Sequence, residues 1–211
     1  MTPNPIAKQG QSSFTSPGIL ILMFLWGAFI TFLARNDLLQ AIDDQPPLMI
    51  LLAAVIPSLI FLSGYKLSSS LRTWVANLNL EQVFALQAWR VVGAAFLFTW
   101  GYGLLPAGFA IPAGIGDIAV GLAAPFIAVK VAKRSRRWKL SAWWFIFAGL
   151  LDFIVAFGTG IMFREGGALH HAGEQHSGLL AEFPLTLIPS YLVPAFLLLH
   201  IIAIIKLRTK R

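Results

Sequence analysis

Six stretches of the chain are apolar over a length that could cross a membrane, and short polar stretches separate them. They lie at residues 18–34, 47–64, 82–104, 109–130, 141–163 and 184–205. A membrane helix needs about 20 mainly apolar residues to cross the hydrocarbon core. The pattern therefore predicts an all-α fold, a polytopic integral membrane bundle of six transmembrane helices that forms a single domain over residues 18–206.

The polar stretches predict the remaining elements. Residues 1–17 are rich in proline and serine and form a cytoplasmic leader that we expect to be disordered, and residues 207–211 form a basic cytoplasmic tail. Apolar residues recur at helical spacing over residues 67–78, which predicts a short amphipathic helix in the membrane interface. The short turn at residues 106–108 makes the third and fourth spans antiparallel neighbours, and we expect the first two spans to be more peripheral.

The composition agrees with a membrane protein and excludes several chemistries. Hydrophobic residues make up 57% of the chain and charged residues 12%, whereas about 25% of the residues of an ordinary soluble domain are charged. The chain contains no cysteine, which excludes disulfides, thiolate nucleophiles and cysteine-ligated iron–sulfur clusters. Any chemistry must therefore come from other side chains of the bundle or its loops.

The basic residues, which give the chain a net charge of +7, are unevenly distributed over the six-span arrangement. Of the 16 Lys and Arg residues, Arg35 and Arg164 fall on one side and Arg90 within a span, while all the others fall on the side with both termini. Because positive charge is retained on the cytoplasmic side, we expect both termini in the cytoplasm of a bacterial-type inner (plasma) membrane. The basic loop at residues 130–139 is expected to face anionic lipid headgroups, and we expect no binding of nucleic acid.

Four ionisable side chains fall inside the predicted spans, where such groups are rare and usually face the bundle interior or a water-filled cavity. In order of increasing depth from the outer ends of their spans, they are Asp117, Asp152, Arg90 and His200. A helical rise of about 1.5 Å per residue places the shallowest about 12 Å deep and the deepest about 24 Å deep. At these depths the four residues would form a ladder across the membrane.

Small residues beside these groups indicate that they are buried between helices. Each aspartate shares its helix face with alanines and glycines, and the third span carries a stripe of polar and small residues, Gln87, Arg90, Ala94 and Gly101. Small residues let helices approach closely, so we expect both carboxyls to point at protein and not at lipid. We predict a buried polar cluster with Arg90 as the counter-ion of one or both aspartates, and with Gln87 and His200 toward the cytoplasmic side.

One arginine faces two carboxyls in this predicted cluster, which allows two interpretations. Arg90 and one aspartate could form a structural ion pair that fixes the register of the helices. The other aspartate would then lack a full partner, and a carboxyl in that position could carry a proton or bind a cation. The surplus carboxyl thus predicts a proton- or cation-linked site near the membrane centre.

A motif in the fourth span resembles the GxGD signature of intramembrane aspartyl proteases of the presenilin and prepilin-peptidase type. It is Gly-Ile-Gly-Asp at residues 114–117, and Pro-Ala-Phe at residues 194–196 resembles the Pro-Ala-Leu motif of presenilin-like proteases. The resemblance implies a hydrolase in which Asp117 and Asp152 activate a water. That family places its other catalytic aspartate before GxGD, whereas Asp152 follows it. The two glycines could instead break or tighten the start of a helix after Pro112.

The loop after the fifth span gathers three imidazoles and a carboxylate, His170, His171, Glu174 and His176. Imidazole and carboxylate suit zinc, copper or nickel, so the loop is a candidate site for a divalent metal. The spacing matches no established metal signature, and the glycines of this loop also suit a solvated polar loop without a metal. We predict no other cofactor.

Three classes of function stay open. The first is a small proton- or cation-linked transport or channel-like module, and the second is a hydrolase that uses Asp117 and Asp152. The third is a non-catalytic accessory or assembly subunit, for which a protein partner or a homo-oligomer would be expected. Geometry separates the first two, because a hydrolase needs both carboxyls close enough to share a water, whereas an ion pair needs Arg90 inserted between or against them.

Overall fold

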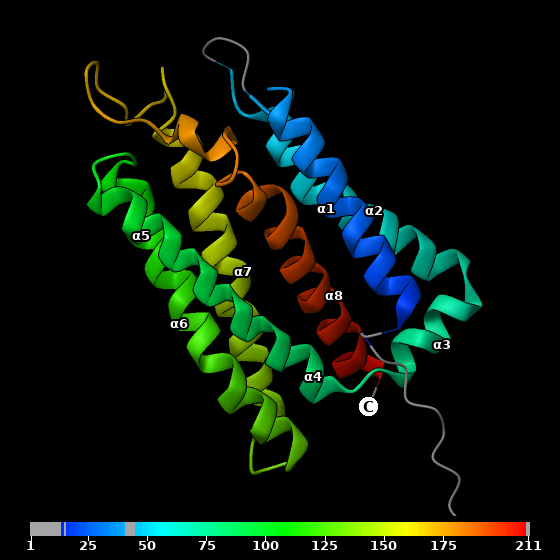
Figure 1. Ribbon diagram of the computed structural model, residues 1–211. Coiled ribbons are helices and arrows are strands. Elements are labelled where there is room, and N and C mark those ends of the chain that lie inside the picture. The colour runs from blue at the N-terminus through cyan, green and yellow to red at the C-terminus, as the bar shows by residue number, and fades with distance from the viewer. Residues whose placement is uncertain (1–13, 15, 41–44, 210–211) are drawn as a thin grey trace, which may run out of the picture.

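The computed structural model describes residues 14, 16–40 and 45–209, and its architecture is all-α (Figure 1). Six helices are long and apolar enough to cross a membrane. They are α1 (Pro17–Arg35), α2 (Leu48–Leu67), the continuous run α4–η1–α5 (Leu80–Gly101), α6 (Ala107–Ala132), α7 (Trp138–Met162) and the run η3–α8 (Ile188–Thr209). The predicted six-span bundle is confirmed, and its six candidate transmembrane helices indicate a multi-pass membrane protein.

The third span is a composite, built from α4 (Leu80–Ala85), η1 (Leu86–Gly93) and α5 (Ala94–Gly101). The central part, η1, is a 3₁₀ helix, which has three residues per turn and is seldom longer than three or four residues. Gln87, Arg90 and Gly93 are its buried residues, so the spacing of three places them in one row facing the interior. The predicted stripe continued to Ala94 and Gly101, which was wrong: Ala94 is half-buried and Gly101 is exposed, because the three-residue repeat of η1 leads the buried row to Gly93 instead.

The bundle is organised around α6, which packs most extensively against α7 and η1. The last span begins with a π-helical turn, η3 (Ile188–Leu192), and continues as α8 (Val193–Thr209), which packs against α7, α4 and α2. The contacts of α1 lie mainly with η3, and its Leu22 and Phe24 side chains are 67% and 73% exposed. The first two spans are thus peripheral, as predicted, and lie across α8 from the other spans (Figure 1).

The connection between the third and fourth spans differs from the predicted bounds. The turn between the third and fourth spans comprises residues 102–106, because α6 already begins at Ala107 with Pro106 as its N-cap. The fourth span then continues without interruption through Pro112 and both glycines of the Gly-Ile-Gly-Asp motif, so these residues do not break the helix. Most of the predicted leader lies outside the described residues, as do residues 210–211 of the predicted tail, whereas α8 extends through Thr209.

The predicted amphipathic segment forms a short helix, α3 (Ser69–Asn77), between the second and third spans. It begins at an N-cap in which the backbone N–H of Leu71 donates to the Ser68 hydroxyl over 3.2 Å. At its other end, the buried Lys206 ammonium of α8 donates to the carbonyl oxygens of Val75 and Ala76 at 2.9 and 2.8 Å. A cation therefore satisfies the carbonyls at the helix C-terminus, where the helix dipole favours positive charge.

The two ends of the bundle carry different loops. We call the end that carries the loop between α7 and α8, with the short 3₁₀ helix η2 (Ser177–Ala181), the His-loop end. We call the opposite end, which carries α3 and the Arg-rich turn between α6 and α7, the basic end. The helices α6 and α8 both begin at the His-loop end, and the C-terminus lies at the basic end (Figure 1).

Candidate functional site

Arg90 is fully buried in the middle of the bundle, and its guanidinium joins three other helices. Its Nε donates to Asp117 Oδ1 of α6 over 2.8 Å, and its Nη2 donates to Asp152 Oδ2 of α7. Its Nη1 donates to the Gly149 carbonyl over 3.2 Å and lies 3.3 Å from His200 Nε2 of α8. The predicted cluster of Arg90, both aspartates and His200 is therefore present.

The cluster forms at one level and not as a ladder. Because Asp117 lies ten residues from the start of α6 and Asp152 ten residues from the end of α7, both lie about 15 Å from the His-loop end of their helices. The predicted spread of depths was wrong, since the true helix ends differ from the predicted ones by up to four residues. Arg90 lies at the same level because it bonds both carboxylates directly.

The face of the guanidinium packs on an aromatic ring. Arg90 Cζ lies 3.9 Å from the centre of the Phe153 ring, one residue after Asp152 on α7. A cation over the face of a ring is attracted by the ring quadrupole, more strongly where water is excluded. The rings of Phe145 and Phe153 also flank His200, with centroids 6.0 Å from the imidazole. Aromatic packing therefore encloses the ionic cluster toward α7 and α8.

Three glycines make room for the cluster. A methyl group on Gly116 would overlap Asp152 Oδ1, and one on Gly93 would overlap the side chain of Asp117. A methyl group on Gly149 would lie 2.5 Å from His200 Nε2 and 3.0 Å from Arg90 Nη1. Each charged group therefore sits against the bare backbone of a neighbouring helix. This role of Gly93 was not predicted from the sequence, although its place three residues after Arg90 was a usable signal.

His200 and Gln87 complete the polar centre. An arginine can only donate, so the His200 Nε2 that faces Arg90 accepts, and the imidazole is neutral with its proton on Nδ1. Gln87 donates from Nε2 to the Phe196 carbonyl over 3.1 Å. Within the described part of the chain, the buried atoms His200 Nδ1 and Gln87 Oε1 have no hydrogen-bond partner. His200 lies at the level of Arg90, and Gln87 lies one 3₁₀ turn closer to the basic end.

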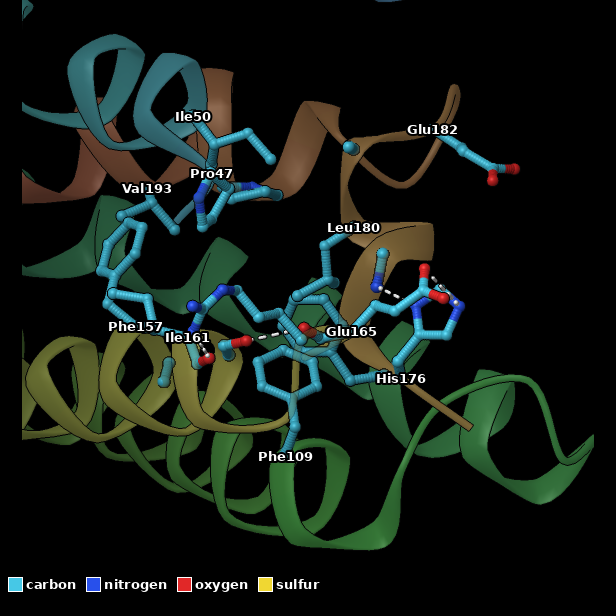
Figure 2. A pocket seen from close by; sticks show the side chains of 18 of the residues that line it. Pro47, Ile50, Phe109, Phe157, Ile161, Glu165, His176, Leu180, Glu182 and Val193 are labelled. Carbon is cyan, nitrogen blue, oxygen red and sulfur yellow. Dashed lines mark hydrogen bonds and ion pairs between the residues drawn. The ribbon is translucent and has the colours of Figure 1, made fainter. Parts of the chain in front are cut away.

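A cavity of about 280 Å³ connects this cluster to the His-loop end (Figure 2). Its wall is mainly apolar and is drawn from α2, α6, α7, η2 and α8, with Ile50, Phe109, Phe157, Leu180 and Val193 among its residues. Its polar lining includes Glu165, His176 and Glu182 in the His-loop region, and Asp117 within α6. The cavity therefore reaches one carboxylate of the central cluster.

A family model described as a domain of unknown function, DUF8737, matches residues 46–208. The chain belongs to this family. No curated protein and no solved structure matches the chain.

The DUF8737 match includes α2 through nearly all of α8, and therefore every residue of the Arg90 cluster and most of the cavity wall. It leaves out α1, the span with the fewest buried residues. The function of this family is unknown.

The histidine side chains of the loop between α7 and α8 make local contacts. The rings of His170 and His176 meet edge to face at 5.8 Å, and His170 Nε2 lies 3.2 Å from the backbone oxygen of Glu174. His176 Nδ1 accepts from the Gly178 N–H over 3.0 Å, and its Nε2 lies 3.9 Å from Glu165 Oε2. Among the described residues, no three His, Asp or Glu side chains form a group that could hold a metal ion. A metal site that uses His171 or its neighbours stays a prediction.

Proposed function

We propose that this chain is a small proton- or cation-linked transport or channel-like module of a bacterial-type inner membrane. In this proposal both termini are cytoplasmic and the His-loop end faces outward, because the basic residues concentrate at the other end. The basic turn between α6 and α7 then faces anionic headgroups. The cavity at the His-loop end gives solutes outside the cell a route to the membrane centre.

The observation that carries the proposal is a cavity that reaches an ionic cluster with surplus negative charge. Two aspartates face one guanidinium, and the imidazole of His200 accepts from Arg90 and adds no charge. Uncompensated charge inside a membrane is costly, so a proton or a small cation is needed to balance the second carboxylate. Asp117 lines the cavity, and this balancing charge can enter and leave there.

The hydrolase interpretation receives less support from the same geometry. Paired acid and base catalysis needs two carboxyls that share a water. Here neighbouring nitrogens of Arg90 bond one oxygen of each carboxylate, which is the arrangement of an ion pair. No contact of the described residues favours the hydrolase specifically, so we do not propose it as a second function.

Ion flux into vesicles tests the proposal. The purified full-length protein is reconstituted into liposomes that contain a pH-sensitive dye, and the internal pH is followed under an imposed membrane potential with Na⁺ or K⁺ gradients. We expect flux above that of empty liposomes, and at least a tenfold loss in Asp117→Asn and Asp152→Asn. The matched control is Glu174→Gln, which removes an exposed carboxylate outside the cavity lining.

Size-exclusion elution and far-ultraviolet circular dichroism show whether each variant is folded before its flux is compared. If liposomes that contain the wild-type protein show no more ion flux than empty liposomes under every gradient, the proposal is refuted and the accessory-subunit class is favoured. Flux that is equal in the wild type and in folded Asp117→Asn and Asp152→Asn variants would also refute it.

A further inference from the structure

We infer that the cavity at the His-loop end binds a small organic cation, a protonated amine or quaternary ammonium ion with an apolar body. The inference rests on the proposed function, since it names the ligand class of the cavity that reaches Asp117. Three features of the described residues support it: the excess of negative charge around the cavity, the aromatic side chains of its wall, and the Asp117 carboxylate oxygen that Arg90 does not bond.

The charges around the cavity are predominantly negative. Asp117, Glu165, Glu182 and Arg164 line it, and Asp117 shares the Arg90 guanidinium with Asp152 behind the lining. The cavity and the ion pair that it reaches therefore contain four carboxylates and two guanidinium groups. Arg164 already donates from Nη1 to the Ile161 carbonyl over 3.0 Å, at the C-terminal end of α7 where the helix dipole favours a cation. A cavity with this balance concentrates cations and disfavours anions.

The wall provides aromatic faces for such an ion. Phe96, Phe109, Phe153 and Phe157 all line the cavity. Phe153 already carries the Arg90 guanidinium on one face, which shows that this part of the bundle tolerates a cation on a ring. Aromatic walls of this kind favour ammonium ions with apolar substituents over a hydrated metal ion, because they provide few oxygen ligands.

Asp117 provides the fixed charge at the inner part of the cavity. It is 6% exposed, and Arg90 engages only its Oδ1 atom, while Oδ2 accepts no hydrogen bond from the described residues. A buried carboxylate with a spare oxygen is a partner for an ammonium N–H or a compact quaternary head. The volume of about 280 Å³ limits the ligand to a compact molecule, since sites for drug-sized ligands start at about 300 Å³.

Binding of benzyltrimethylammonium to the full-length protein in phosphatidylcholine nanodiscs tests the inference. Equilibrium dialysis with the radiolabelled ion measures affinity, and 3-phenylpropionate, an anion of similar size, measures charge selectivity. We expect saturable binding of the cation at one site per chain and at least tenfold weaker binding of the anion. The double variant Glu165→Gln/Glu182→Gln should lower the affinity for the cation by about fivefold, which is the effect expected from losing one or two partly screened charges.

Asp117→Asn should lower the affinity for the cation by at least tenfold. Glu174→Gln, the control at an exposed residue outside the cavity lining, should leave this affinity unchanged. If Asp117→Asn does not fold, the surface double variant still decides. The inference is overturned if empty nanodiscs bind the cation equally, if the anion binds as tightly, or if the double variant and Glu174→Gln behave alike. Cation binding without any ion flux would refute the transport proposal alone, whereas flux without cation binding would refute this inference alone.

Discussion

Gly116→Ala tests whether bare backbone on α6 holds the ionic cluster together. A methyl group at this position would overlap Asp152 Oδ1. The nearest relief is a displacement of the Asp152 side chain away from α6, which pulls its Oδ2 away from Arg90 Nη2. The substitution therefore reaches the central ion pair without changing a charged residue.

The expected loss of stability follows from two destabilising effects and one stabilising effect. Breaking a buried ion pair costs about 3–5 kcal/mol, because a charge stays behind without its partner. Crowding a packed interface adds about 1–3 kcal/mol, whereas alanine is about 1 kcal/mol more favourable than glycine inside a helix. Since Asp152 can shift without leaving the cluster, the lower bounds apply, and the net loss of stability is about 3 kcal/mol.

Unfolding by sodium dodecyl sulfate in mixed micelles, followed by circular dichroism, measures this difference. The matched control is Gly158→Ala on α7, because a methyl group there meets no atom within 4 Å. The control should change the free energy of unfolding by no more than about 1 kcal/mol, the difference in helix propensity. Equal stability of Gly116→Ala and Gly158→Ala would refute the idea that this glycine seats the Asp152 carboxylate.

Two further predictions concern the buried cations Arg90 and Lys206. Arg90→Met should destabilise the protein by about 3–5 kcal/mol, because it leaves two carboxylates without their partner, and adding Asp117→Asn and Asp152→Asn should restore most of this loss in the same unfolding assay. Lys206→Met should speed hydrogen exchange of the α3 amides and cost about 2 kcal/mol through lost charge-assisted hydrogen bonds. Exchange in α3 that is no faster than in Lys66→Met, which removes an exposed lysine, would contradict the capping role of Lys206.

The spans and the meeting of their charges could be predicted from the sequence for one physical reason. Lipid provides neither hydrogen bonds nor counter-charge, so the length of each apolar run fixes a helix, and each ionisable group within it must face a partner. Arg90, Asp117 and Asp152 satisfy one another as that argument requires.

The local geometry of the site could not be predicted in the same way. The 3₁₀ segment at residues 86–93 packs closely against α6, and the helix propensities of its residues give no signal that it is 3₁₀ and not α-helical. The motif that resembles GxGD drew attention to Gly114 and Gly116 as helix breakers, whereas Gly116 provides space for a side chain of another helix. The cavity is formed by segments far apart in the chain, from α2 to α8, which no local pattern brings together.

In η1, the 3₁₀ segment of the third span, one change of helix type would alter both the length of the span and the alignment of its buried side chains. A 3₁₀ helix rises about 2.0 Å per residue and an α-helix about 1.5 Å, so the 8 residues of η1 would shorten by about 4 Å on relaxing to an α-helix. Three residues make a full turn in the first form and about 60° less in the second, so Gly93 would swing away from the line through Arg90. Asp117 would then lose the hollow that receives it, and the reach of this span across the bilayer would contract in the same movement.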